Sequence, residues 1–166
     1  MRRVAVLAVN GVVAFDLSIP CEVFGRAPLP DADRYIVQVC GETPEVRADA
    51  FGIRCPWTLS DLETADMVVV PGIDDPTRPV SDAVLAALHR AWSRGALIAS
   101  ICTGTFTLAA TGLLDGRTVT THWLAAELLA QRYPALTVDP NVLFVDEGRI
   151  VTAAGASAGI DMCLHL

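Results

Sequence analysis

The sequence predicts an α/β protein built on a mostly parallel sheet that helices cover on both faces. Apolar segments of strand length alternate with segments of helical spacing along most of the chain, and strands buried on both faces read as continuous apolar runs. Of the 166 residues, 52% are hydrophobic and 19% are charged, which suits one compact domain with a substantial core. Neither a repeat nor a linker-like segment divides the chain, so we expect a single domain over residues 1–166.

Short runs of Val, Ile, Leu and Ala mark the strands. In chain order, the expected strands are residues 3–9, 35–41, 65–72, 96–102 and 118–122. Residues 46–57 are interrupted by Gly52 and Pro56 and are expected to form a short hairpin or an irregular pair. A second hairpin is expected over residues 142–155, with its turn at 146–148. Ligands of such sheets bind beyond the carboxyl ends of the strands, at a switch point in the strand order.

Helical spacing, capping residues and helix-stop residues mark the helices. In chain order, the expected helices are residues 18–27, 81–95, 105–112, 123–134 and 157–166. The first is expected to begin near Ser18, with Pro20 in its first turn. Ser81 is the expected cap of the second helix and Gly95 its end. The last helix stays apolar up to Leu166, which is typical of a helix that continues, so we expect the chain to be part of a longer protein.

The charge of the chain excludes some functions. The formal net charge is −7, which argues against nucleic-acid binding by this chain alone. All twelve basic residues are arginine, and the absence of lysine excludes Schiff-base catalysis by a side-chain amine.

Five cysteines are scattered along the chain without CxxC spacing. This pattern is typical of reduced thiols in the cytoplasm and predicts neither a disulfide framework nor a metal site. No cofactor is expected. The first residues, "MRRVAVLAVNG", lack a small-residue cleavage site and read as a buried strand, and no apolar run is long enough to span a membrane. We therefore expect a cytoplasmic protein that does not bind membranes.

The stretch "LIASICTG", residues 97–104, ends a predicted strand on Cys102 just before a predicted helix. Two interpretations are open: a small buried core residue, or a nucleophile presented on a strand-to-helix turn. A thiol near a helix N-terminus has a lowered pKa, so we expect Cys102 to be substantially thiolate at neutral pH. Gly104 would permit a close approach at the turn, and Thr103 with the backbone amides after the thiol would hold an anion or a carbonyl oxygen.

Three other strand ends supply candidate partners for Cys102. Asp16 follows the first strand and would exchange a proton with the thiol, unless it only complements a helix dipole; Glu22 is an alternative to it. The backbone amides of Gly72 and Ile73, at the end of "VVVPGI", are expected to face the same point. His122 ends "TVTTH" and is either a further member of the site or structural. If charged and close, Asp16 would raise the thiol pKa; if protonated, it would donate a hydrogen bond to the thiolate. The catalytic candidates are therefore Cys102, Asp16 and His122.

Four stretches together carry a family resemblance: "FDLSIPCEVF", "VVVPG", "SICTGTFTLAATGLLDGRTVTTHW" and "GRIVTAAGASAGIDMCLHL". The chain resembles the ThiJ/PfpI family of the class I glutamine amidotransferase-like superfamily over nearly its whole length. The resemblance implies a flavodoxin-like three-layer sandwich with a mostly parallel sheet, a cysteine at a nucleophile elbow, and a homodimer. Glutaminases of the superfamily pair their cysteine with a late histidine and a glutamate beyond it. Nothing acidic follows His165, so glutamine hydrolysis is not expected.

Two groups within this superfamily match more closely. Asp16, Cys102 and Thr103 are similar to the pattern of isonitrile hydratases. The stretches "AATGLLDGRTVTTHW" and "AGIDMCLHL" resemble AraC-family transcriptional regulators whose N-terminal domain is ThiJ/PfpI-like. The resemblance implies an effector-sensing domain with a small molecule at a Cys102-centred pocket, and a C-terminal helix-turn-helix domain, beyond these 166 residues, that binds DNA. An isonitrile hydratase or amidase-like hydrolase is the alternative, and a thiol oxidant sensor is compatible with either.

Overall fold

The computed structural model describes residues 2–27 and 34–166. Its strands are β1 (Arg2–Ala8), β2 (Tyr35–Gly41), β3 (Glu45–Arg47), β4 (Gly52–Arg54), β5 (Trp57–Thr58), β6 (Met67–Val70), β7 (Leu97–Ile101), β8 (Thr118–Val119), β9 (Thr137–Val138), β10 (Phe144–Asp146) and β11 (Ile150–Ala153). Its helices are α1 (Ala14–Gly25), α2 (Leu59–Leu62), α3 (Asp82–Ser93), α4 (Gly104–Ala109), the 3₁₀ helix η2 (Trp123–Ala125), α5 (Ala126–Arg132) and α6 (Ser157–His165).

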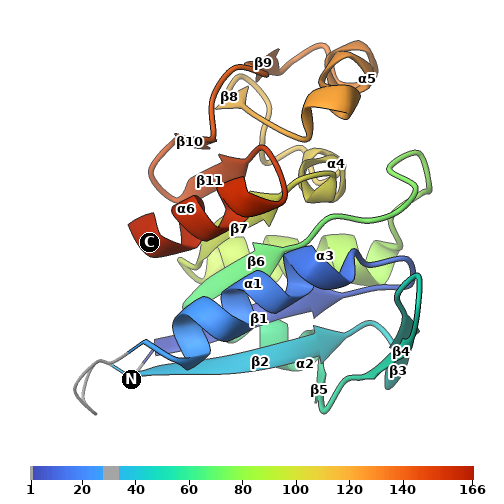
Figure 1. Ribbon diagram of the computed structural model, residues 1–166, viewed down its shortest axis with the longest axis vertical. Coiled ribbons are helices and arrows are strands. Elements are labelled where there is room, and N and C mark those ends of the chain that lie inside the picture. The colour runs from blue at the N-terminus through green and yellow to red at the C-terminus, as the bar shows by residue number, and fades with distance from the viewer. Residues whose placement is uncertain (1, 28–33) are drawn as a thin grey trace.

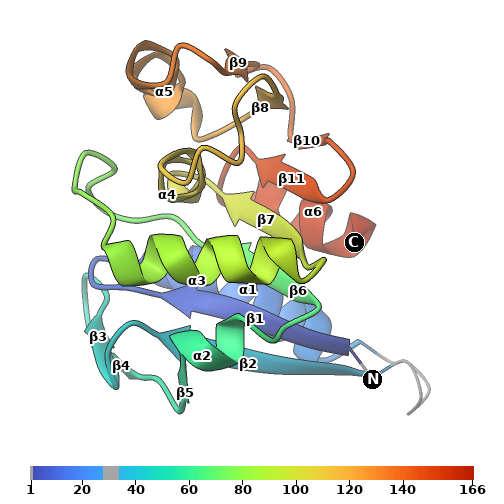
Figure 2. The same ribbon diagram turned by 180° about the vertical axis from the view of Figure 1, so that it is seen from behind.

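Seven strands form the central sheet, in the order β10-β11-β7-β6-β1-β2-β5. Neighbouring strands are parallel except β10 and β11, which form the expected hairpin. The helices α1 and α6 cover one face of the sheet (Figure 1), and α2, α3 and α4 lie on the other (Figure 2). This arrangement confirms the predicted α/β class and is a flavodoxin-like three-layer sandwich.

The strand β6 shows why the apolar runs are continuous. Val68 packs on one side of the sheet in a cluster with Leu88 of α3, whereas Val69 packs on the other side in a cluster with Met162 of α6. Because successive side chains of a strand point to opposite faces, a strand covered on both faces needs apolar residues at every position. The core therefore has two layers, one on each side of the sheet.

The first helix differs from its prediction. It begins at Ala14, four positions before Ser18, so Pro20 lies inside it and not in its first turn. The reason is a contact that the sequence does not show: the Val13 N–H donates to the Gly72 carbonyl oxygen at 2.8 Å. This bond holds the chain against the end of β6 just before the helix, and α1 starts there without a side-chain cap.

The segment 118–122 also differs from its prediction. Only Thr118–Val119 is a strand, and this strand, β8, pairs with β9 in a separate two-stranded sheet. His122 is therefore not at a strand end of the central sheet; it precedes η2, which begins the predicted helix 123–134. The sequence also missed β9 and α2, since elements of two to four residues carry no periodic signal. Within the described ranges, no helix combines the length and apolarity needed to cross a membrane.

The start of α4 packs very closely on the segment that follows β6. A Cβ atom at Gly104, which is buried, would overlap the carbonyl oxygens of Val70 and Pro71. The close approach that the sequence predicted at Gly104 is therefore present, and it sets the distance between α4 and β6.

We expect Gly104→Ala to lower the free energy of unfolding by about 1–3 kcal/mol, because the added methyl group meets backbone atoms that cannot move aside. The matched control is Gly25→Ala in α1, where the new Cβ would be 3.9 Å from Val37 Cγ2, an ordinary contact. The control should leave stability unchanged or slightly higher. Urea denaturation of the three proteins measures both effects, and equal stability of the two variants would contradict the packing argument.

Candidate functional site

Cys102 lies on a strained turn between β7 and α4. Its φ angle is +57°, in the left-handed region that residues other than glycine seldom adopt. Its N–H donates to the Ala153 carbonyl oxygen at 3.0 Å, at the end of β11. Its carbonyl oxygen accepts from the Thr121 hydroxyl at 2.7 Å. The predicted strand-to-helix turn is thus present, and hydrogen bonds from two other segments hold it.

A buried network of hydroxyl and backbone groups holds the segments on either side of the turn together. The Thr105 hydroxyl bonds to the Ser100 hydroxyl and donates to the Thr120 carbonyl oxygen, both at 2.9 Å. The Thr120 N–H donates to the Thr152 hydroxyl, also at 2.9 Å. These bonds join the segment 118–122 to β7 and β11. The sequence analysis missed these residues, although the density of Ser and Thr in "ASICTGTFT" and "TVTTH" is a signal for them.

Thr103 bonds to the segment that follows β6, and its hydroxyl also lies close enough to Cys102 to favour the thiolate. Its hydroxyl donates to the Ile73 carbonyl oxygen at 2.7 Å and accepts from the Ile73 N–H at 2.8 Å. The Ile73 N–H is therefore occupied, and it does not face the thiol as expected. Of the two expected amides, that of Gly72 lies beside Asp16.

Asp16 reaches Cys102, as predicted from the two strand ends. It lies in the first turn of α1 and is 2% exposed. A Cβ on Gly72 would be 3.2 Å from the Cys102 Cβ and would overlap Asp16 Oδ2, so only glycine leaves room for the carboxyl there. Asp16 Oδ2 is fully buried, and no donor within residues 2–27 and 34–166 makes a well-formed hydrogen bond to it.

Burial governs the acidity of both groups. The pKa of Asp16 is raised, because desolvation outweighs the opposing effects of the Cys102 thiol, the Gly72 and Ala156 N–H groups and His122. The pKa of the Cys102 thiol is raised to about 11, first by desolvation and then by the negative charge of Asp16. The Thr103 N–H acts in the opposite direction but is outweighed. The expectation of a thiolate at neutral pH is therefore wrong: burial and the negative charge of Asp16 raise the thiol pKa by more than the hydrogen bonds from Thr103 lower it.

His122 and the start of α6 complete the surroundings of the thiol. A Cβ on Gly155 would be 3.2 Å from Cys102 Sγ and 3.1 Å from His122 Cδ2, so a side chain at this position would crowd both the thiol and the imidazole. His122 Nδ1 accepts from the Leu124 N–H at 3.3 Å, which leaves Nε2 as the free ring nitrogen. Ala156, with φ +47°, turns the chain so that its N–H faces Asp16. The sequence analysis missed Gly155 and Ala156; "AAGASAG" is their only signal.

Two other candidate groups lie elsewhere. The Glu22 carboxylate is 62% exposed and pairs with Arg26 at 2.5 Å, so it does not replace Asp16. His165, near the C-terminal end of α6 (Figure 1), bonds to Asp146 at 2.7 Å. In the part of the chain that the structure describes, no three His, Cys, Asp or Glu side chains gather in a way that would hold a metal ion. The site thus offers a neutral thiol, a buried carboxyl that retains its proton above the usual pH, and an imidazole.

We expect Asp16→Asn to speed alkylation of Cys102 by iodoacetamide at mildly alkaline pH by roughly three- to tenfold. The thiol ionises at a pH where Asp16 already carries its charge, so removing that charge lowers the thiol pKa. The rate is measured by mass spectrometry of the Cys102 peptide. Glu22→Gln removes an exposed carboxylate from the same helix and should leave the rate unchanged. A slower or unchanged rate in Asp16→Asn would contradict the electrostatic account.

Comparison with known proteins places this arrangement in a family. The model of the DJ-1/PfpI family matches residues 2–166. The HTH-type transcriptional regulator CdhR of Pseudomonas aeruginosa is 32% identical over 136 residues, which are 82% of this chain but only 40% of CdhR. Isonitrile hydratase of Pseudomonas putida is 31% identical over 156 residues, covering 93% of this chain and 66% of the hydratase.

The fold is also found among solved structures. The crystal structure of an AraC family transcriptional regulator from Pseudomonas putida superposes with a TM-score of 0.83 at 19% identity. The superposition covers 99% of this chain and 90% of that one. At this identity the likeness shows the shared fold, and the family match rests on the sequence. The chain belongs to the DJ-1/PfpI family.

Proposed function

We propose that this chain is the effector-sensing domain of an AraC-family transcriptional regulator, and that a small molecule binds in the pocket around Cys102. The observation that carries the proposal is the Asp16 carboxyl, which is buried beside the thiol with no well-formed hydrogen bond to its Oδ2 within the described ranges. The Cys102 thiol and the Gly72 and Ala156 N–H groups approach this carboxyl without completing a well-formed bond to Oδ2, and buried polar atoms are almost always paired, which supports a ligand there. The similarity to CdhR supports a regulator.

DNA binding would belong to a separate segment. The chain carries a net charge of −7 and spans 40% of the length of CdhR, so a basic DNA-reading surface has to be supplied outside these residues. Regulators of this kind read paired DNA sites, for which two-fold symmetry is useful. Phe15 of α1 and Ile160 and Leu164 of α6 are exposed apolar side chains on the two helices that cover one face of the sheet (Figure 1), which supports a second copy docking on that face.

The isolated domain should therefore be a homodimer in solution. Light scattering at micromolar concentration should return about twice the chain mass of 17.6 kDa. Leu164→Asp, which places a charge on this apolar face, should shift the mass toward the monomer, whereas Leu143→Asp on the exposed loop before β10 should not. A monomer mass for the unchanged protein would count against the dimer.

An isonitrile hydratase is the second candidate, favoured by the contact between Asp16 and Cys102. In this reaction the sulfur would add to the isonitrile carbon while the thiol proton passes, by way of Asp16, to the same carbon, giving a thioimidate. Water would then attack the thioimidate carbon and release a formamide and the thiol. A thiol pKa of about 11 disfavours this candidate, because little thiolate is present at neutral pH.

A paired measurement separates the two functions. For a sensor, the protein should form no formamide from an alkyl isonitrile beyond the amount formed by Cys102→Ala. One or more compounds from a panel of small amides and carbonyl compounds should raise its melting temperature. The shift should be lost in Asp16→Asn and kept in Glu22→Gln. Formamide production that disappears in Cys102→Ala would instead establish the hydratase, and a panel without any shift would count against the sensor.

A further inference from the structure

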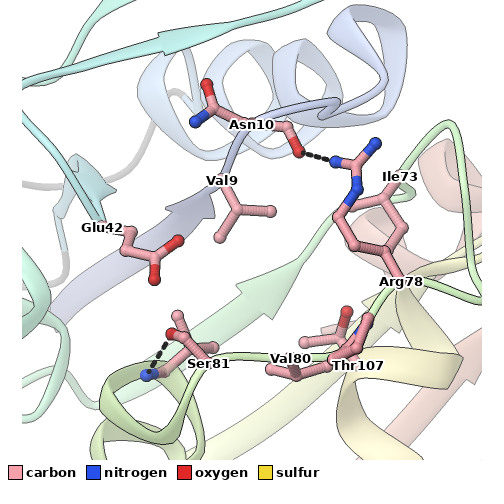
Figure 3. A pocket seen from close by; sticks show the side chains of 10 residues that line it. Val9, Asn10, Glu42, Ile73, Arg78, Val80, Ser81 and Thr107 are labelled. Carbon is pink, nitrogen blue, oxygen red and sulfur yellow. Dashed lines mark hydrogen bonds between the residues drawn. The ribbon is translucent and has the colours of Figure 1, made fainter.

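A second cavity lies on the α3 side of the sheet, beyond the carboxyl ends of β1, β2 and β6 (Figure 3). Its volume is about 240 Å³. The strand order turns at β1, since β2 lies on one side of it and β6 on the other. Such switch points are where ligands bind in open α/β sheets. Cys102, Asp16 and His122 do not line this cavity, so it is separate from the site of the proposed function.

The charges around the cavity leave one carboxylate without a partner. Arg78 donates to Asp74 Oδ1 at 3.1 Å and to the Asn10 carbonyl oxygen at 2.7 Å, so its charge is already compensated. Glu42, which follows β2, is exposed on the cavity wall, and the ranges 2–27 and 34–166 hold no ion pair or hydrogen bond to its carboxylate. The cavity therefore presents an uncompensated negative charge.

The remaining walls are mostly aliphatic. Val9, Ile73, Val80 and Val84 supply branched side chains from four different segments. Thr107 of α4 adds a hydroxyl; the residue is 3% exposed, and within the described chain this hydroxyl makes no hydrogen bond. A hydroxyl on a cavity wall that is not bonded to the protein is available to a ligand or to water. A cavity of this size suits a ligand of a few heavy atoms.

We propose that this cavity is a second small-molecule site, which binds a primary alkylammonium. The ammonium group lies against the Glu42 carboxylate, and the alkyl chain packs on Val9 and Val84. The Arg78 guanidinium remains bonded to Asp74 and to the Asn10 carbonyl oxygen, so it is not available to bind a carboxylate ligand of the same size. The proposal goes beyond the sensing pocket at Cys102 and does not depend on it.

The test is a titration of the ¹⁵N-labelled protein with propylammonium chloride, followed by NMR. Saturable shifts are expected in the amide signals of Val9, Glu42 and Val84, with weak affinity because the probe has few heavy atoms. Glu42→Gln should weaken binding about tenfold or more, since it removes the charged partner of the hydrogen bond. Glu45→Gln, an exposed glutamate on β3, is the matched control and should bind like the unchanged protein.

Three further titrations make the outcome specific. The neutral isostere 1-propanol and the anion propionate should give no saturable shifts in the cavity. Cys102→Ala should bind propylammonium unchanged, which separates this site from the one at Cys102. The proposal is overturned if Glu42→Gln binds as tightly as the unchanged protein, if 1-propanol binds equally well, if no saturable shift occurs, or if the shifts map to Gly72, Cys102 and Ala156 instead.

Discussion

The left-handed backbone of Cys102 is the constraint on which the site depends. A non-glycine residue in this region costs about 1–3 kcal/mol, and the cost persists only where surrounding contacts fix the backbone. Here Ala153 holds the Cys102 N–H and Thr121 holds its carbonyl oxygen. The absence of a side chain at Gly104 lets the following helix start directly against the end of β6. The turn directs the thiol toward Asp16, so the hydrogen bonds that stabilise the fold also position the reactive group.

The electrostatics of the site follow from that placement. A carboxyl and a thiol are both buried, and ionisation of either opposes ionisation of the other, so they titrate as a coupled pair. Because the folded-state pKa of Asp16 is raised, its contribution to stability is present below the unfolded pKa and is lost as pH rises through the folded value. Asp61 and Asp146 act in the opposite sense, since hydrogen bonds lower their pKa values. The site is thus maintained at a cost to stability near neutral pH, which a binding function would explain.

The sequence predicted the architecture and the meeting of Asp16 with Cys102 for one physical reason. Parallel strands end at the same edge of a sheet, so residues that follow different strands come together there. It did not predict that the thiol would be neutral at pH 7, because helix position is visible in a sequence whereas the extent of desolvation is not. The reciprocal bonds between Thr103 and Ile73, and the pairing of β8 with β9, are also tertiary contacts that leave no local signal.

Ile73 lies between the two candidate sites. Its side chain lines the cavity beside Glu42, while its N–H and carbonyl oxygen are both bonded to Thr103, the neighbour of Cys102. Ligands at two sites influence each other only if they bind two arrangements of the protein with different affinity. A second arrangement in which the backbone of Ile73 moves would strain both of its bonds to Thr103, whereas a change in its side chain alone would leave them in place. Two short bonds on one residue therefore make the wall between the sites stiff, and they favour independent binding over communication.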